Sequence, residues 1–440
     1  MTVRTDVPLN GDGDTVASRD DACPSCVSRR SLLKTAVGMT AASMAGLTGS
    51  MLSTRLAFAA SPAYTGDVVV VLSLRGGMDG LSVVVPAGDP AYYTNRPTIA
   101  VAQNQLLQVN GMFGLHPALA PLAPFWAAGK MGAVHAVGQV DPTRSHFDAT
   151  EEMERAAPGS SIRTGWLDRA LGLRSMGSVF QASHLGWDLP PESLNGPFNE
   201  LALGRIDGFT LDVASDVTES NRWATALSAL TAGAPNAVTA PASAAIGAFT
   251  TTTAKKAAGY TTANGAVYDT NSSLASALRD VARLIKADVG LQAATLDYNN
   301  WDMHQDLGSA TAGWMFDNLT ELSSALAAFA TDMGTSGMAN VTVVTLSEFG
   351  RRVEENGSGG VDHGHGNVVL MLGGGVNGGQ VYGTWPGLAD NKLDNGDLAG
   401  TTDYRVILSE VLRKRCGQSS LSTVFPGLSG SELGVVQTKP

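Results

Sequence analysis

Four of the seven histidines in this chain stand within three positions of a carboxylate. They are His146 after Arg144-Ser145, His304 in Asp302-Met303-His304, and His363 and His365 in Asp362-His363-Gly364-His365. Imidazole together with carboxylate is the ligand set of zinc, manganese and mixed divalent sites. The sequence therefore predicts a metal centre, with Asp362, His363 and His365 as its strongest cluster.

Two further carboxylates follow runs of apolar residues. Asp79 lies in the glycine-rich turn Arg75-Gly76-Gly77-Met78-Asp79-Gly80, and Glu348 lies in Ser347-Glu348-Phe349-Gly350-Arg351. Aspartate in such a turn is often only a turn former, and Glu348 could belong to an ion-paired surface turn. The segment with Glu348 directly follows a predicted strand, and the turn with Asp79 continues from another, so we include Asp79 and Glu348 among the candidate ligands.

Ser145 lies at the expected start of a helix and allows two interpretations. It could be only an N-cap, because serine oxygens accept hydrogen bonds from the first helical N–H groups. With Arg144 and His146 beside it, it could instead be a nucleophile, and the free N–H groups of the helix start would bind an anion. We therefore predict Ser145, Arg144 and His146 as candidate catalytic residues.

The elements that must position these residues alternate along the chain. Four short runs are apolar and rich in β-branched residues, as in strands buried on both faces: Val68–Leu74, Met131–Val137, Val341–Leu346 and Val368–Leu372. Helical patterns separate them: Ala118–Gly129, Phe147–Ala156, Ser220–Leu230, Ser272–Leu296, Gly313–Met333 and Asp403–Lys414. This alternation predicts a doubly wound α/β fold, with a mostly parallel sheet sandwiched by helices and ligands bound at the carboxyl ends of its strands.

The first 59 residues read as a twin-arginine signal peptide rather than as part of the fold. Ser28–Lys34 holds the Arg-Arg pair, an apolar stretch follows, and Ala57-Phe58-Ala59 is a small-x-small cleavage site. A membrane anchor is disfavoured because the stretch is rich in Gly, Ser and Thr and is interrupted by Arg55. We expect contact with the Tat translocase during export, no stable membrane span, and a final location in the periplasm, cell wall or medium.

The remaining chain, residues 60–440, is expected to form a single domain. Its Ala/Thr-rich part near 232–264 shows little periodicity and predicts a loose insertion or a frayed helical arm. Cys23 and Cys26 fall in the leader, so Cys416 alone remains and a disulfide framework is excluded. A net charge of −11, with 44% hydrophobic and 16% charged residues, argues against nucleic acid as a partner and against global disorder.

With these motifs laid out, the chain resembles the exported bacterial family catalogued as domain of unknown function 1501. The resemblance is carried by the twin-arginine leader, Leu74–Leu81, Arg144–Phe147, Trp301–His304, Ser347–Arg351, Asp362–Gly364 and Val376-x-Gly378-Gly379. It implies membership of the alkaline-phosphatase and sulfatase-like superfamily, which places two divalent metals beside a Ser, Thr or modified Cys nucleophile.

The resemblance also implies roles for individual residues. Asp79 resembles the early acidic ligand, Ser145 the nucleophile, Asp302 and His304 the middle ligand pair, and His363, supported by Asp362 or His365, the late ligand. Glu348 stands where the superfamily usually has an Asp-His pair. Phe349 replaces a metal-binding histidine, Asp79 lies farther from its strand than usual, and the middle pair is closely spaced. These departures predict that one of the two metal positions is weakened or lost.

Together these observations predict an exported metal-dependent hydrolase of phosphate or sulfate esters, with a small-molecule or polymer-linked ester as its substrate. The ion would be zinc, calcium, manganese or magnesium, and Arg144 or Arg351 would steady the oxygens of the transferring group. The alternative is a non-catalytic surface or assembly protein on a degenerate hydrolase scaffold. The phenylalanine at position 349, in place of a metal-binding histidine, and the Ala/Thr-rich arm favour that alternative.

Overall fold

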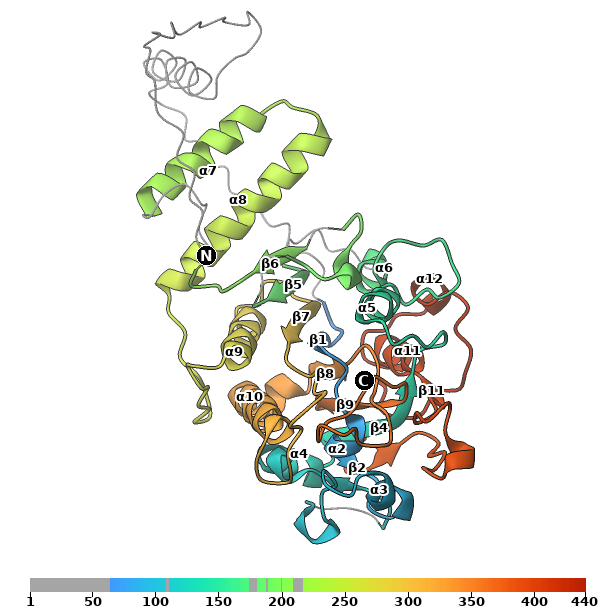
Figure 1. Ribbon diagram of the computed structural model, residues 1–440. Helices are drawn as coiled ribbons and strands as arrows, with labels where there is room; N and C mark the ends of the chain where they lie inside the picture. The colour runs from blue at the N-terminus through green and yellow to red at the C-terminus, as the bar shows by residue number, and fades with distance from the viewer. Residues whose placement is uncertain (1–63, 108–110, 174–179, 187–188, 199, 209–216) are drawn as a thin grey trace, which may run out of the picture. The chain divides into compact units, whose positions relative to one another are not determined.

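The four apolar runs predicted as buried strands lie side by side at the centre of one sheet (Figure 1). They are β1 (Val68–Leu74), β4 (Met131–Gly138), β8 (Val341–Leu346) and β9 (Asn367–Gly373), in the spatial order β4-β9-β8-β1. Every residue of β1, β8 and β9 is buried, as expected for strands covered on both faces. The structure is a computed structural model that describes residues 64–107, 111–173, 180–186, 189–198, 200–208 and 217–440.

Within those residues the sheet has nine strands, in the order β10-β4-β9-β8-β1-β7-β5-β6, with β11 also paired to β4. The added strands are β5 (Ala182–Leu185), β6 (Leu201–Leu203), β7 (Ala293–Tyr298), β10 (Val381–Tyr382) and β11 (Thr402–Asp403). Strand β9 runs antiparallel to β4 and β8, and the other neighbours in this sheet are parallel. The predicted fold class is confirmed.

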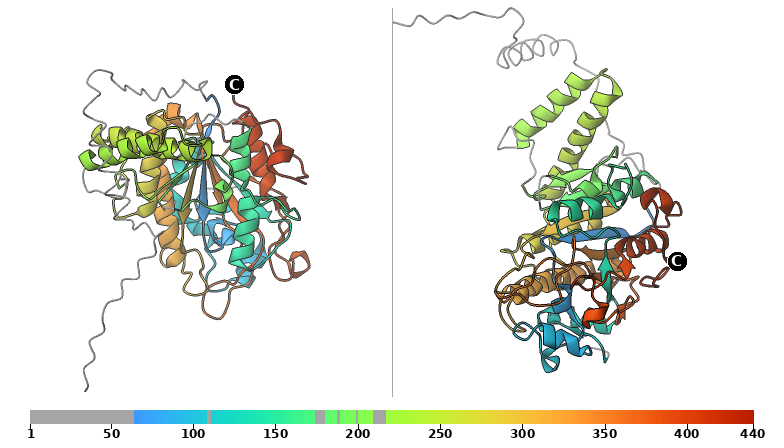
Figure 2. Two further views of the ribbon diagram at one scale, coloured as in Figure 1. Left: turned by 90° about the horizontal axis from the view of Figure 1, so that it is seen from above. Right: turned by 45° about the vertical axis from the view of Figure 1, so that its right-hand side comes forward.

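Helices cover both faces of the sheet (Figures 1 and 2). Alternate residues of β1 enter different hydrophobic clusters, because successive side chains of a strand point to opposite faces. One cluster contains α9 (Ser273–Lys286) and α10 (Trp314–Met338). The other contains α5 (His146–Arg155), α6 (Trp166–Gly172), α11 (Tyr404–Lys414) and α12 (Leu421–Val424).

The predicted helix over Ser272–Leu296 is wrong in its second half. Helix α9 ends at Lys286, and the chain re-enters the sheet as β7. Asp288 and Gly290 between them have positive φ values of 50° and 81°, which a continuous right-handed helix does not allow. The Ala-Ala-Thr-Leu sequence of β7 resembles a helix in composition, and its burial in the sheet decides its conformation.

The remaining elements are short or lie at the margins of the sheet. They are α2 (Gly80–Val83), β2 (Val84–Val85), α3 (Pro90–Asn95), η2 (Gln103–Gln105), β3 (Gly114–Leu115), η3 (Pro117–Leu122), α4 (Ala123–Ala127), η4 (Glu192–Leu194), α7 (Val217–Thr231), α8 (Asn236–Ala257) and η5 (Asp390–Lys392). Helix α8 spans most of the Ala/Thr-rich segment, whereas the predicted signal peptide lies outside the described residues. Among the helices that the structure describes, none has the length and apolar character needed to cross a membrane.

Candidate metal centre

The loops that carry the predicted ligands meet at one edge of the sheet. Strands β1, β7, β8 and β4 share one direction, so the segments that follow them all emerge at this edge. Strand β9 runs in the opposite direction, so the loop that precedes it arrives there as well. This is the edge at which ligands bind in open α/β sheets.

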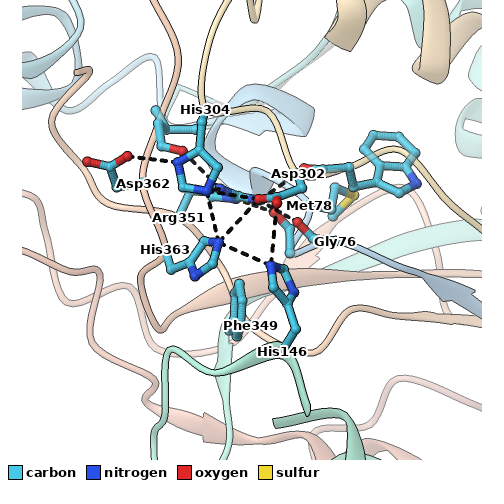
Figure 3. Close-up of polar contacts among 12 residues, drawn as sticks. Gly76, Met78, His146, Asp302, His304, Phe349, Arg351, Asp362 and His363 are labelled. Carbon is cyan, nitrogen blue, oxygen red and sulfur yellow. Dashed lines mark hydrogen bonds and ion pairs between the residues drawn. The ribbon is translucent and has the colours of Figure 1, made fainter. Parts of the chain in front are cut away.

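Three imidazole rings point toward one another at this edge (Figure 3). Nε2 of His363 lies 3.1 Å from Nε2 of His146 and 3.0 Å from Nε2 of His304. The carboxylate of Asp302 lies among them, with Oδ1 3.0 Å from His304 Nε2 and 3.2 Å from His363 Nε2. Its Oδ2 is 3.6 Å from His146 Nε2. We call these four residues the ligand ring.

Each of the three imidazoles has its other nitrogen bound to an acceptor outside the ring. The Nδ1–H groups donate as follows: His146 to Glu348 Oε1 at 2.9 Å, His304 to Asp362 Oδ1 at 2.8 Å, and His363 to the Arg144 carbonyl at 2.9 Å. A neutral imidazole protonated at Nδ1 presents only a lone pair at Nε2. Three lone pairs and a carboxylate therefore converge, and such outer partners are typical of metal-binding histidines.

The spacing of the ring atoms fits a transition-metal ion. Bonds of about 2.0–2.2 Å to nitrogen and oxygen place ligand atoms about 3.3–3.6 Å apart in a tetrahedron and about 2.8–3.1 Å apart in an octahedron. The five separations given above run from 3.0 to 3.6 Å. His146, Asp302 and His363 each offer one ligand atom within 4.8 Å of the others. The residues present therefore fit a divalent cation.

Arg351 connects the ligand ring to the loops that surround it. Its Nη2 donates to Asp302 Oδ1 at 2.6 Å, and its side chain is fully buried. The guanidinium also donates to backbone carbonyls of the loops that form the site: Gly76, Gly77, Trp301 and Val361. Because these contacts are all within the protein, Arg351 positions Asp302 and the loops. The prediction that Arg351 steadies the oxygens of a substrate is not supported by this geometry.

The groups around the ring hold its carboxylates in the ionised form that binds a cation. Partial burial alone would raise the pKa of Asp302, but the hydrogen bond and charge of Arg351 outweigh it and lower that pKa to about 2. Burial also acts to raise the pKa of Glu348, yet hydrogen bonds from His146 and backbone N–H groups lower it. The hydrogen bond to Glu348 raises the pKa of His146, so a proton competes with a cation for this imidazole as the pH falls. Both carboxylates are thus ionised at neutral pH and ready to balance a cation.

Phe349, which stands where the resemblance expects a histidine ligand, packs against two of the imidazoles. Its ring centroid lies 4.8 Å from that of His146 and 4.7 Å from that of His363. The phenyl ring also leaves no room for a larger residue at Gly77, because a Cβ added there would collide with it. Phe349 therefore limits the rotation of both rings.

Glu348 and Asp362, predicted as ligands, hold His146 and His304 from outside the ring. Two other predicted ligands lie elsewhere. Asp79 is buried, and both its oxygens are bound by Arg96. His365 directs Nε2 to the carbonyl of Gln139 at 3.1 Å. The structure therefore does not bring Asp79 or His365 into the ring.

The predicted catalytic residues surround the start of α5. The Ser145 hydroxyl accepts a hydrogen bond from the N–H of Asp148 at 3.4 Å and caps the helix. The half-exposed side chain of Arg144 pairs with Asp397 at 2.6 Å. His146, expected to assist Ser145, instead contributes to the ligand ring. His146 is the first residue of α5. The predicted start of this helix had already placed His146 near the ends of the strands.

One supporting residue was missed. Asn356 donates to the carbonyl of His304 at 2.8 Å and to Asp362 Oδ1 at 3.2 Å, and so fixes both. Nothing in the local sequence distinguishes this asparagine from an ordinary loop residue, because its partner His304 is 52 positions away.

Comparison with solved structures gives only distant likenesses. The lipoteichoic acid synthase LtaP from Listeria monocytogenes shares 10% identity over 76% of this chain and 71% of its own, with a TM-score of 0.31. Alkaline phosphatase from the Antarctic bacterium TAB5 shares 9% identity over 70% of this chain and 92% of its own, with a TM-score of 0.26. These TM-scores are too low to carry an argument about function.

No curated protein matches the chain. The family model described as "Protein of unknown function (DUF1501)" matches residues 131–410, which hold the ligand ring and most of the sheet. This match covers more than half of the chain and confirms the resemblance drawn from the motifs. The chain belongs to the DUF1501 family.

Proposed function

We propose that the protein is an exported metal-dependent hydrolase of phosphate or sulfate esters. The observation that carries this proposal is the convergence of three Nε2 atoms and one carboxylate, each imidazole being oriented by an acceptor on its far side. Side chains of Asp302 and His304 are 47% and 44% exposed, so the ring is open to a substrate from one side. A buried structural metal site would not need this opening.

A divalent ion bound by the ring would polarise the ester and lower the pKa of a nucleophile beside it. In the overall reaction, oxygen from water attaches to phosphorus or sulfur, the bond to the ester oxygen breaks, and the departing alcohol takes up a proton. Glu348, Asp362 and the Arg144 carbonyl hold the imidazoles in one tautomer throughout. Ser145, at the start of the helix that carries His146, is the candidate nucleophile. The half-exposed guanidinium of Arg144, which also pairs with Asp397, is the candidate contact for the transferring group.

Export by the twin-arginine route remains part of this proposal. Its support is the motif in Ser28–Lys34 and the cleavage site at Ala57–Ala59.

The alternative, a non-catalytic scaffold, has one specific observation in its favour. Asp79, which the resemblance assigns to a metal, is locked in a buried ion pair with Arg96. An assay separates the two functions: the metal-loaded chain is incubated with aryl phosphates and aryl sulfates, beside a His363→Ala variant. The hydrolase predicts ion-dependent turnover that the variant lacks. Bound ion without turnover on either ester class would support the scaffold.

A further inference from the structure

Asp79 and Arg96 form a closed pair in the interior of the protein. Arg96 Nη1 lies 2.5 Å from Asp79 Oδ2, and Nη2 lies 2.9 Å from Oδ1. Ser82 also donates to Oδ2 at 2.6 Å. Asp79 is 1% exposed and Arg96 is 0% exposed. Both carboxylate oxygens are therefore used, and the charge is already neutralised by a guanidinium.

The rest of Arg96 is equally engaged. Its Nε donates to the carbonyl of Val353 and its Nη2 to the carbonyl of Arg352, both at 2.9 Å. These carbonyls directly follow Arg351, whose own guanidinium holds Asp302 on the ring. The pair thus lies behind the loop that carries Arg351, and two fixed guanidinium groups stand on the inner side of the ring.

The other predicted ligands are also committed. Glu348 Oε1 accepts from His146 and from the N–H of Gly76 at 2.8 Å. Asp362 Oδ1 accepts from His304 and Asn356. In the part of the chain that the structure describes, the ring supplies the one group of three or more side chains spaced to share an ion. Among those described residues, no second group of three or more such side chains is left for another cation beside it.

We infer that the centre holds a single ion of the nitrogen-preferring first-row transition class, and that Arg96 fills the charge-balancing place of a second cation at Asp79. This inference rests on the metal centre of the proposed function and gives it a stoichiometry and a metal class. Three imidazoles and one carboxylate suit zinc and its neighbours, whereas magnesium and calcium prefer all-oxygen ligand sets.

The test is native mass spectrometry of the full chain with Cys23→Ser and Cys26→Ser, so that leader thiolates cannot bind zinc. The stripped protein is titrated with zinc, and then with zinc against excess magnesium or calcium. The same titration is made with Asp79→Asn, which removes the charge that Arg96 balances, and with His363→Ala, which removes a ring nitrogen.

We expect one zinc ion per chain, not displaced by a tenfold excess of magnesium or calcium. Asp79→Asn should keep that ion, and His363→Ala should lose it. Two ions per chain, the second lost in Asp79→Asn, would overturn the inference while leaving a metal-dependent hydrolase intact, as would displacement of zinc by magnesium. No bound ion under any condition would instead contradict the metal centre itself. If Asp79→Asn does not fold, the inference is still tested by the chain with Asp79 intact, through its number of zinc ions and their displacement by magnesium or calcium.

Discussion

Replacing His363 and His365 separately by alanine should have opposite consequences for metal binding, although the two residues lie in one loop. His363→Ala removes the imidazole whose Nε2 is within 3.2 Å of three other ring residues. Loss of an outer partner alone typically weakens metal affinity about 10–100-fold, so loss of this ring nitrogen should cost more. His365→Ala removes a half-buried imidazole whose Nε2 bonds only to the Gln139 carbonyl, and should leave affinity unchanged.

The two variants share one direct cost to the fold. Each loses one hydrogen bond to a backbone carbonyl, worth about 1 kcal/mol. An ion present at a hundred times its Kd adds about 2.7 kcal/mol to the stability of the unsubstituted protein. Chelator should therefore lower the Tm of the His365→Ala protein as it does that of the parent, and should barely change the Tm of the His363→Ala protein.

Thermal melting with and without chelator, together with metal content, measures both effects on the same samples. The reasoning would be refuted if His363→Ala retained the ion and its chelator-dependent Tm. It would be refuted equally if His365→Ala lost the ion, because the ligand ring would then be wrongly composed.

Three further predictions concern residues around the ring. Glu348→Gln should weaken zinc binding about 10–100-fold in calorimetric titration, because a neutral amide does not supply the negative charge that makes His146 a stronger ligand; unchanged affinity would remove Glu348 from the outer partners. Arg351→Lys should destabilise the protein by about 1–3 kcal/mol in urea unfolding, because one ammonium cannot reach the carbonyls and Asp302 Oδ1 together; an unchanged midpoint would count against the role of Arg351 in joining the loops. Burial, with the charge of Asp141, raises the pKa of Glu152 on α5 to about 7, against about 4.3 when unfolded, so stability falls as pH rises between these values. Glu152→Gln should thus raise Tm at pH 8 and leave it unchanged near pH 4, and an equal rise at both would contradict this.

The sheet could be predicted because its central strands have one composition. Val68–Leu74 and Val341–Leu346 are continuous apolar and β-branched runs, and β1 and β8 have these bounds. Strand β7 could not be recognised in the same way, since its alanines continue the pattern of α9. The break between them depends on left-handed backbone at Asp288 and Gly290, which neither residue demands on its own.

The sequence predicted which residues form the candidate site better than it predicted what each residue does there. Asp302, His304 and His363 were expected as ligands, and they come together. His146 was assigned to catalysis, because which way its imidazole turns depends on Glu348, 202 positions later in the chain. Asp79 resembled a ligand in sequence, but the long-range folding of the segment from Asp79 to Arg96 pairs the two charges instead. Such pairings depend on tertiary packing, which local sequence does not specify.

Diffraction from crystals of the zinc-loaded protein, recorded at the zinc absorption edge, tests the central claim most directly. The account predicts one anomalous peak per chain, about 2.0–2.2 Å from an oxygen of Asp302 and from the Nε2 atoms of His146, His304 and His363. Zinc found only elsewhere, or no peak at the ring while the three imidazoles keep their positions, would contradict it.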